Sequence, residues 1–176
     1  MKSDGYDSPD QITGWFAGRM PERWFTGAPT VSVDREEILV IGALTEPDAP
    51  KDATPEAVAA ARAARIEGFR EDTREHRMRI AQEAQQRFGR RVSWGGRCGE
   101  LERLFTTVSV PAMTRLRMPE RRVLDTLVEA GVARSRSHAL AWCVRLVAER
   151  QEEWLQDLRD ALTHVEKVRS EGPSSG

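Results

Sequence analysis

Two arginines at alternate positions, Arg115 and Arg117, are the residues of this 176-residue chain whose type and spacing best suit specific chemistry. Between Val108 and Met118 the even-numbered residues are mostly apolar, and the odd-numbered ones include Met113 and both arginines. Such alternation predicts a strand with one buried face and one face in water. A planar guanidinium on the wet face can donate to O6 and N7 of one guanine, although arginines in such positions often serve only solubility.

The residues after this strand change their period and predict two helices joined by a short turn. Pro119 cannot donate to a β-ladder, but its fixed φ suits the first turn of a helix. The apolar stripe that starts at Val123 ends before Gly131, a residue type that often closes helices in the left-handed conformation. Ser135 or Ser137 can then cap the second helix.

A strand, a helix started by Pro, a Gly stop and a helix capped by Ser, in this order, resemble the ribbon-helix-helix family of dimeric bacterial DNA-binding proteins over about residues 110–150. The resemblance implies that two chains pair their strands antiparallel and that this ribbon enters the major groove. The residues it places against base edges are Met113, Arg115 and Arg117. It also implies a DNA phosphate at the start of the second helix, where free N–H groups and the helix dipole attract an anion. The residues at that position are Arg134, Ser135, Arg136 and Ser137.

The predicted strand requires a second chain even without the family resemblance. A strand followed by two helices cannot bury one face and satisfy both of its edges, and a two-fold copy of itself is the simplest source of a partner strand. We therefore expect a homodimer, with room for higher assembly, and double-stranded DNA as its partner. The alternative is a structural or protein-interaction module that keeps this dimer scaffold but has its ribbon face covered.

The N-terminal half predicts a small hairpin and a long helix. Residues 1–13 are polar and are expected to be disordered. Residues 14–46 hold aromatic side chains, which we expect to pack internally rather than against a partner, and two short strands around a turn at residues 34–37. Residues 54–89 carry an apolar stripe at helical spacing and predict one amphipathic helix of about eight turns. We expect this stripe to pack against the long helix after Ser137.

Residues 90–170 are predicted to combine short strands, at residues 91–93 and 104–108, with the ribbon-helix-helix unit. Its last helix is expected to extend in one piece to about Val165, and residues 171–176 to form a flexible tail. The fold class expected is α+β and mostly helical. It combines a C-terminal ribbon-helix-helix dimerisation unit with an N-terminal β-hairpin and long helix.

The charge of the chain is unevenly distributed. A formal net charge of −1 argues against a protein that coats nucleic acid by bulk charge. Residues 112–140 carry 6 basic and 3 acidic side chains, whereas residues 1–54 carry 5 basic and 10 acidic ones. This asymmetry is expected if only the ribbon and its flanks meet phosphate. The absence of a signal-like start or a membrane-length apolar run favours a cytoplasmic location and no membrane partner.

Side chains suited to catalysis or metal binding are not grouped by the sequence pattern. The three histidines, His76, His138 and His164, fall on predicted helices without a nucleophile pattern beside them. Cys98 and Cys143 have no paired spacing, so neither a disulfide framework nor a zinc site is expected. A glycine pair at residues 95–96 lacks the lysine of a phosphate-binding loop and favours a plain turn. We expect no enzyme, no catalytic residue, no metal and no cofactor.

Three short aromatic stretches carry a second resemblance. Residues 24–27, 92–95 and 142–143 read Trp-Phe-Thr-Gly, Val-Ser-Trp-Gly and Trp-Cys, and they make the whole chain similar to an uncharacterised family from high-GC Gram-positive bacteria. That similarity implies lineage and no activity. From the residues and the first resemblance together, we expect a dimeric, sequence-specific DNA-binding protein, a transcriptional regulator that reads the major groove with a two-stranded ribbon.

Overall fold

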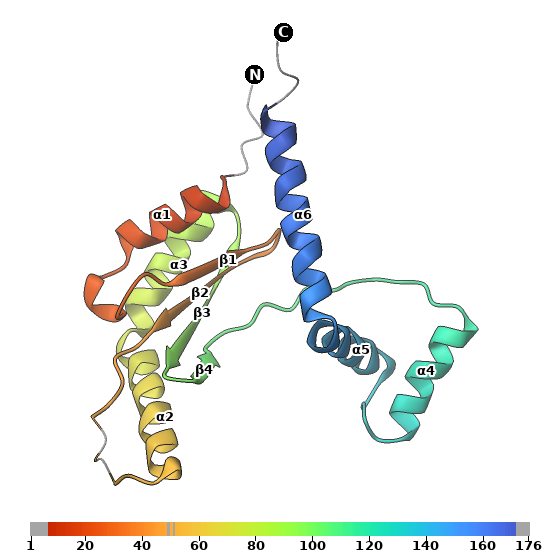
Figure 1. Cartoon of the computed structure of the whole chain (residues 1–176), viewed down its shortest axis with the longest axis horizontal. Helices are drawn as coiled ribbons and strands as arrows, with labels where there is room; N and C mark the ends of the chain where they lie inside the picture. The colour runs from red at the N-terminus through yellow and green to blue at the C-terminus, as the bar shows by residue number, and fades with distance from the viewer. Residues whose placement is uncertain (1–6, 49, 51, 172–176) are drawn as a thin grey trace. The chain divides into compact units, whose positions relative to one another are not determined.

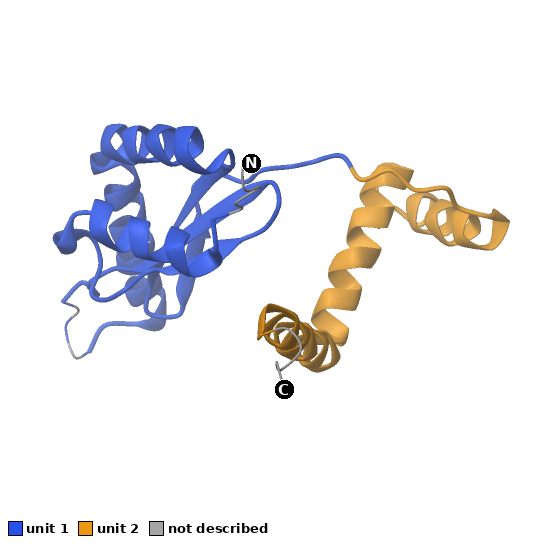
Figure 2. Cartoon of the chain, turned by 90° about the horizontal axis from the view of Figure 1, so that it is seen from above, with its two compact units in different colours: residues 1–111 blue, residues 112–176 orange. Residues whose placement is uncertain are grey.

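The computed structural model describes residues 7–48, 50 and 52–171, and the chain divides into two compact units (Figure 2). The first unit is Met1–Pro111 and the second is Ala112–Gly176. The expected α+β, mostly helical class is confirmed. Residues 1–6 of the segment expected to be disordered, and 172–176 of the expected tail, lie outside the described residues.

The first unit is built on a four-stranded sheet in the order β1-β2-β3-β4 (Figure 1). Its strands are β1 Thr30–Val33, β2 Glu37–Ala43, β3 Arg91–Cys98 and β4 Leu101–Leu104. β1 and β2 form the predicted hairpin, and the carboxylate of Asp34 holds its turn by accepting from the N–H groups of Glu36 and Glu37 at 2.8 and 2.7 Å. β2 and β3 are parallel, so the chain must cross over between them, whereas β3 and β4 are antiparallel.

Two helices make this crossover where one was predicted. α2 (Pro55–Asp72) ends and α3 (Arg74–Phe88) begins at Thr73, whose φ of −101° and ψ of 0° lie outside the helical region. The hydroxyl of Thr73 donates to the carbonyl oxygen of Phe69 at 2.6 Å and accepts from Nε of Arg77 at 2.9 Å. The side chain thus offers hydrogen bonds that compete with a continuous helix.

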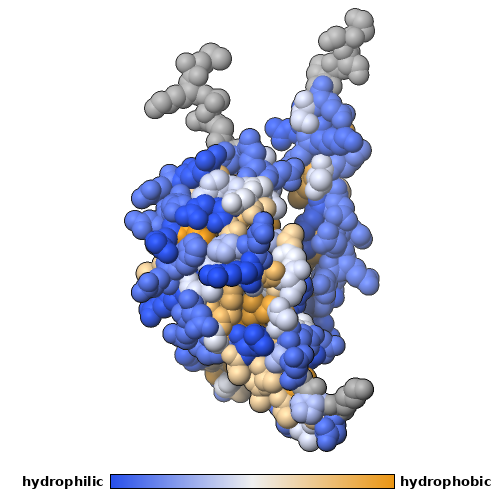
Figure 3. Space-filling view, turned by 90° about the vertical axis from the view of Figure 1, so that its left-hand side faces the viewer, coloured by the Kyte–Doolittle hydropathy of each residue, from blue (hydrophilic) through white to orange (hydrophobic). Residues whose placement is uncertain are grey.

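The hydrophobic core of the first unit lies between its helices and one face of the sheet. Ile80 of α3 packs with Val40 of β2, and Ile66 of α2 packs with Cys98 of β3. The apolar stripe of residues 54–89 is therefore buried against the sheet of its own unit, which corrects the expected packing on the C-terminal helix. The side of the molecule shown in Figure 3 is mostly hydrophilic, with small hydrophobic patches.

Part of the segment expected to be disordered is a helix, α1 (Pro9–Arg19). Ser8 and Gln11 form a capping box at its start, and Ile12 is fully buried. The sequence does contain a signal for this helix that the prediction missed, namely the capping pair on either side of Pro9. Burial of Ile12 against the sheet then outweighs the polar composition of the segment.

The aromatic side chains of residues 14–46 pack internally, as predicted. Phe16 meets Trp94 of β3 with 6.0 Å between ring centroids. A short 3₁₀ turn, η1 (Glu22–Trp24), places Trp24 5.7 Å from Phe69 and 5.1 Å from His76. His76 is thus a packed residue.

Two glycines expected in a turn lie inside β3, which is longer than predicted. A Cβ on Gly95 would lie 3.0 Å from the carbonyl oxygen of Arg103, and one on Gly96 would lie 3.1 Å from the ring of Phe105. A side chain at either position would crowd neighbouring atoms, because these approach the strand closely. The strand expected at residues 104–108 is displaced to β4. Both strands belong to the sheet of the first unit, although the sequence grouped them with the C-terminal region.

The second unit contains three helices: α4 Met118–Glu129, α5 Arg136–Arg150 and α6 Glu152–Glu171. The start at Met118–Pro119 and the stop beside Gly131 are as predicted. The single helix expected after Ser137 is interrupted at Gln151, whose φ is −125° and ψ is 31°. Among the described residues of this unit, the buried hydrophobic side chains are Leu124, Ala133 and Ala139. The buried core of this unit is therefore small.

Candidate nucleic-acid interface

In the segment that precedes α4, the predicted alternation of buried and exposed residues is seen around Leu116. Leu116 is half-buried and packs on the cluster formed around Leu124. Its neighbours Arg115 and Arg117 are exposed, and Met113 is 99% exposed. Most of the other even-numbered residues, which the alternation placed on the buried face, are exposed as well: Val110, Ala112, Thr114 and Met118.

The strand predicted for residues 108–118 is not paired within the described chain. Residues 105–117 belong to no strand, although Arg117 has the extended backbone angles φ −81° and ψ 175°. A strand is recognised by hydrogen bonds to a neighbour, and the predicted neighbour is a second chain. The ribbon itself consequently remains a prediction.

The turn between α4 and α5 is held by glycine and by backbone hydrogen bonds. Gly131 has a φ of 74°, and its N–H donates to the carbonyl oxygen of Val128 at 3.0 Å. The N–H groups of Val132 and Ala133 both donate to the carbonyl oxygen of Leu127. The chain reverses within a few residues and brings the start of α5 beside α4.

Ser135, one of the two serines predicted as a possible cap, caps α5. Its Oγ accepts from the N–H of His138 at 3.2 Å. His138 was not anticipated at this site: its Nδ1 accepts from the N–H of Arg134 at 3.3 Å. The N–H groups of Arg136 and Ser137 have no partner within the described chain, as expected in a first helical turn. They are the groups that could donate to a phosphate.

The side chain of Arg136, predicted to contact a phosphate, is bonded to α4 in the single chain. Its Nε and Nη2 donate to the two carboxylate oxygens of Asp125 at 2.6 and 2.8 Å. This bidentate bond lowers the pKa of Asp125. It also raises the pKa of Arg136. Arg134, exposed and without such a bond in the described chain, is the cation left free at the start of α5.

Large apolar side chains remain in water on the second unit and on the segment before it. Their exposed fractions are 55% for Val110, 57% for Met118, 55% for Val123, 44% for Val132, 63% for Val144 and 49% for Val147. Complete burial of such a side chain from full exposure is favourable by about 1.5–3 kcal/mol, and roughly half of that is still to be gained at each of these positions. These side chains form an apolar surface that the described chain does not cover.

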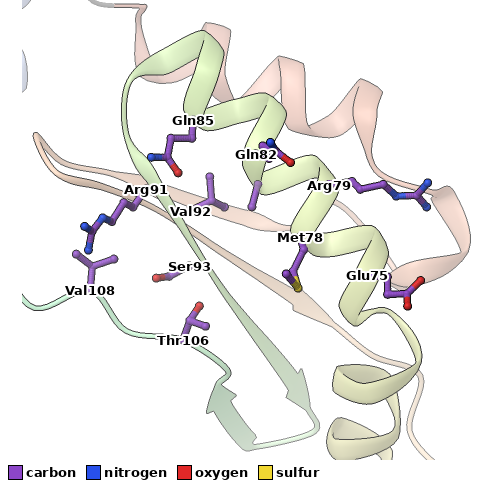
Figure 4. A pocket seen from close by; sticks show the side chains of 11 residues that line it. Glu75, Met78, Arg79, Gln82, Gln85, Arg91, Val92, Ser93, Thr106 and Val108 are labelled. Atoms are coloured by element: carbon purple, nitrogen blue, oxygen red, sulfur yellow. The ribbon is translucent and has the colours of Figure 1, made fainter.

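The first unit has a hollow of about 570 Å³ (Figure 4). It lies beside the first residues of β3, since β4 pairs only with Gly95–Cys98 of that strand. Met78 of α3 and Val92 of β3 supply apolar surface, and Arg91 stands at its rim. The hydroxyl of Ser93 is buried without a hydrogen-bond partner in the described chain. Thr106 and Val108 also line this hollow, so it adjoins the segment that leads to the candidate interface.

Comparison with known proteins divides the chain near the place where the structure does. Residues 10–104 match the family described as "Rv1265-like protein, N-terminal domain", and residues 117–169 match "Mb1296 C-terminal domain". The uncharacterized proteins Mb1296 of Mycobacterium bovis and Rv1265 of Mycobacterium tuberculosis are each 59% identical to the chain over 160 residues. That alignment covers 90% of this chain and 69% of each relative. The chain belongs to this Rv1265-like family.

Membership of the Rv1265-like family confirms the predicted similarity to uncharacterised proteins. The matches do not include the ribbon-helix-helix family, so that assignment is a proposal. No solved structure matches the chain. Residues 105–116, between the two matched regions, contain Met113 and Arg115.

Among the described residues, no helix is both long and apolar enough to cross a membrane. No group of three or more His, Cys, Asp or Glu side chains is placed there to hold a metal ion.

Proposed function

We propose that the C-terminal unit is a dimeric, sequence-specific DNA-binding module of the ribbon-helix-helix type and that the protein is a transcriptional regulator. The observation that carries the proposal is the order of features at residues 112–138. An extended segment anchored by Leu116 is followed by a helix, a left-handed glycine and a serine-capped helix. This order supports the proposal because it is the order in which the family presents base-contacting side chains and then a helix start whose N–H groups donate to a phosphate.

In the proposed complex, two copies pair their segments before α4 as an antiparallel ribbon in the major groove. Arg115 and Arg117 donate to base edges, and Met113 makes apolar contact there. Arg134 and the open N–H groups of Arg136 and Ser137 hold a backbone phosphate. The alternative is a structural or protein-interaction module that keeps the same dimer but has its ribbon face covered; sequence-selective DNA binding in the test below would exclude it.

The test is selection of bound sequences from random duplexes, followed by affinity measurements at several salt concentrations. Arg115→Ala should cost about 1–3 kcal/mol on the selected site and relax its sequence preference, because a base contact is lost. Arg134→Ala should weaken all sequences alike and reduce the salt slope by about one, because a phosphate contact is lost.

A matched control is Arg35→Ala, which removes an exposed arginine from the turn between β1 and β2. It should leave affinity and sequence preference unchanged. Equal effects of Arg115→Ala and Arg35→Ala would contradict base reading by the ribbon.

A further inference from the structure

The last helix, α6, has no buried residue although one side of it is apolar. The exposed fractions are 55% for Trp154, 43% for Leu158, 63% for Leu162, 50% for Val165 and 54% for Val168, and Leu155 is half-buried. Most of the remaining side chains of α6 are charged or polar. A helix with this division normally buries its apolar stripe against another surface.

The spacing of the stripe is that of a coiled coil. Leu155, Leu158, Leu162 and Val165 follow one another at intervals of three, four and three residues, the spacing of the two core positions of a heptad. A second row, Trp154, Ala161 and Val168, repeats every seven residues along one flank. This second row widens the apolar stripe on one flank, whereas the charged Arg159 lies on the other flank.

We propose that α6 packs antiparallel against α6 of a second copy of this chain. Centring the pair on residue 160 places Leu155 on Val165 of the second copy and Leu158 on its Leu162. All four core side chains then meet an apolar partner. On the wide flank the same register places Trp154 beside Val168 of the second copy and Ala161 beside its own equivalent.

The charges along α6 favour this direction. Residues 152–160 carry four carboxylates and one arginine, whereas residues 161–171 carry two carboxylates, one lysine and one arginine. A parallel pair would bring two acidic halves together. The antiparallel pair places each acidic half beside a half without net charge and also opposes the two helix dipoles.

A second copy is favoured as the occupant because the self-complementary register uses the whole stripe. A helix of 20 residues is about 30 Å long, so two copies can bury the stripe over several turns. Tethering two α6 helices through the ribbon dimer would raise their effective concentration. The inference nevertheless does not require that the ribbon bind DNA, so either proposal can fail alone.

Disulfide cross-linking of the full chain tests direction and register. The background is Cys143→Ala, since Cys98 is fully buried. Ala161→Cys should form a disulfide with its own copy. Trp154→Cys and Val168→Cys should form few disulfides alone but should join each other rapidly when the two variants are mixed.

Two other cross-linking results would overturn the proposal. Strong self-cross-linking by Trp154→Cys and Val168→Cys separately would show a parallel pair. Absence of cross-linking at all three positions would show that another surface covers α6, whether the N-terminal unit or a different protein.

Sedimentation of a stripe variant gives an independent readout. Leu158→Lys with Leu162→Lys should weaken self-association of the full chain at least about tenfold, because two core layers gain buried charge. The control is Gln156→Lys with Thr163→Lys, which adds the same charge away from the stripe and should leave self-association unchanged. Circular dichroism checks that helix content is retained. Unchanged self-association of the stripe variant would overturn the proposal.

Discussion

The bidentate bond between Arg136 and Asp125 sets how much positive charge the start of α5 presents. If this end of α5 holds a DNA phosphate, Asp125 competes with that phosphate for Arg136. Asp125→Asn should therefore raise affinity for all DNA sequences and make the salt dependence steeper by up to about one unit of slope. Affinity measured at two salt concentrations checks this, and a weaker variant would contradict the proposed phosphate site.

The ion pair can be verified without DNA. The pKa of the Asp125 carboxyl, measured by NMR titration, should lie below its ordinary value and should return towards it in Arg136→Ala. Because the pKa is lowered on folding, the pair stabilises the unit above the ordinary carboxylate pKa of about 3.9. This contribution is lost as the pH falls through the lowered pKa. Both side chains are exposed, so the effect on stability is small.

Arg77 is a buried cation that fastens the junction of α2 and α3. Burial lowers its pKa to about 10, so it remains charged at neutral pH. Its guanidinium donates to Oγ1 of Thr73 at 2.9 Å and to the carbonyl oxygen of Arg70 at 2.6 Å, and it lies over the ring of Phe105. A lysine has no planar fork to serve two acceptors at once.

Arg77→Lys should therefore lower the free energy of unfolding of the first unit by about 1–3 kcal/mol. Urea unfolding followed by tryptophan fluorescence measures the change, since Trp24 and Trp94 are buried in this unit. The matched variant Arg74→Lys, at an exposed position of the same helix, should stay within about 0.5 kcal/mol of the wild type. A similar loss in both variants would argue against a special role for Arg77.

The turn between α4 and α5 depends on the backbone conformation of one residue. Gly131 has a φ of 74°, and a Cβ there would meet no atom within 4 Å. Gly131→Ala should therefore destabilise the second unit by about 1–2 kcal/mol through backbone strain alone. Hydrogen exchange of the amides in α4 and α5, at fixed protein concentration, measures this loss.

Gly68→Ala is the control, and we expect it to change stability in the opposite direction. Gly68 also has open space around a Cβ, but it lies inside α2 without a positive φ. Alanine should stabilise this helix by about 0.5–1 kcal/mol. If Gly131→Ala were equally stabilising, the left-handed turn would not be the one that the protein adopts in solution.

Elements marked by local signals could be predicted from the sequence, and those decided by distant contacts could not. Pro119, Gly131 and Ser135 each act on their own turn, and α4 and α5 begin or end beside them as predicted. The break at Thr73 depends on a bond with the buried Arg77, and the position of Gly96 inside β3 depends on the ring of Phe105. Neither contact can be predicted from the spacing of apolar residues along the sequence.

The same distinction applies to the candidate site. Alternation correctly predicted that Leu116 packs on the core, but other residues that it placed on the same buried face are exposed in the single chain: Val110, Ala112, Thr114 and Met118. It could not reveal the pairing of Arg136 with Asp125, because those residues are 11 apart in sequence and meet only after the turn has formed. A ribbon made by two chains is beyond what either a single sequence or a single folded chain contains.

At the scale of the whole molecule, the two units differ in how they can be stable. The first buries large side chains such as Phe16, Ile12 and Ile80 completely, so a fragment of residues 1–108 should unfold at a temperature that does not depend on its concentration. The second buries completely or nearly so only Leu124, Ala133 and Ala139 among its described hydrophobic residues. A fragment of residues 109–176 should fold only as it associates.

The decisive measurement is thermal unfolding of both fragments over a hundredfold range of concentration, together with DNA binding. The unfolding temperature of the 109–176 fragment should fall on dilution, because dissociation and unfolding are coupled. This fragment should keep the DNA binding of the full chain, and at low salt bind more tightly, since the acidic residues of 1–54 are removed. Concentration-independent unfolding would contradict the obligate dimer. A folded, dimeric fragment without DNA binding would instead place part of the binding surface on the N-terminal unit.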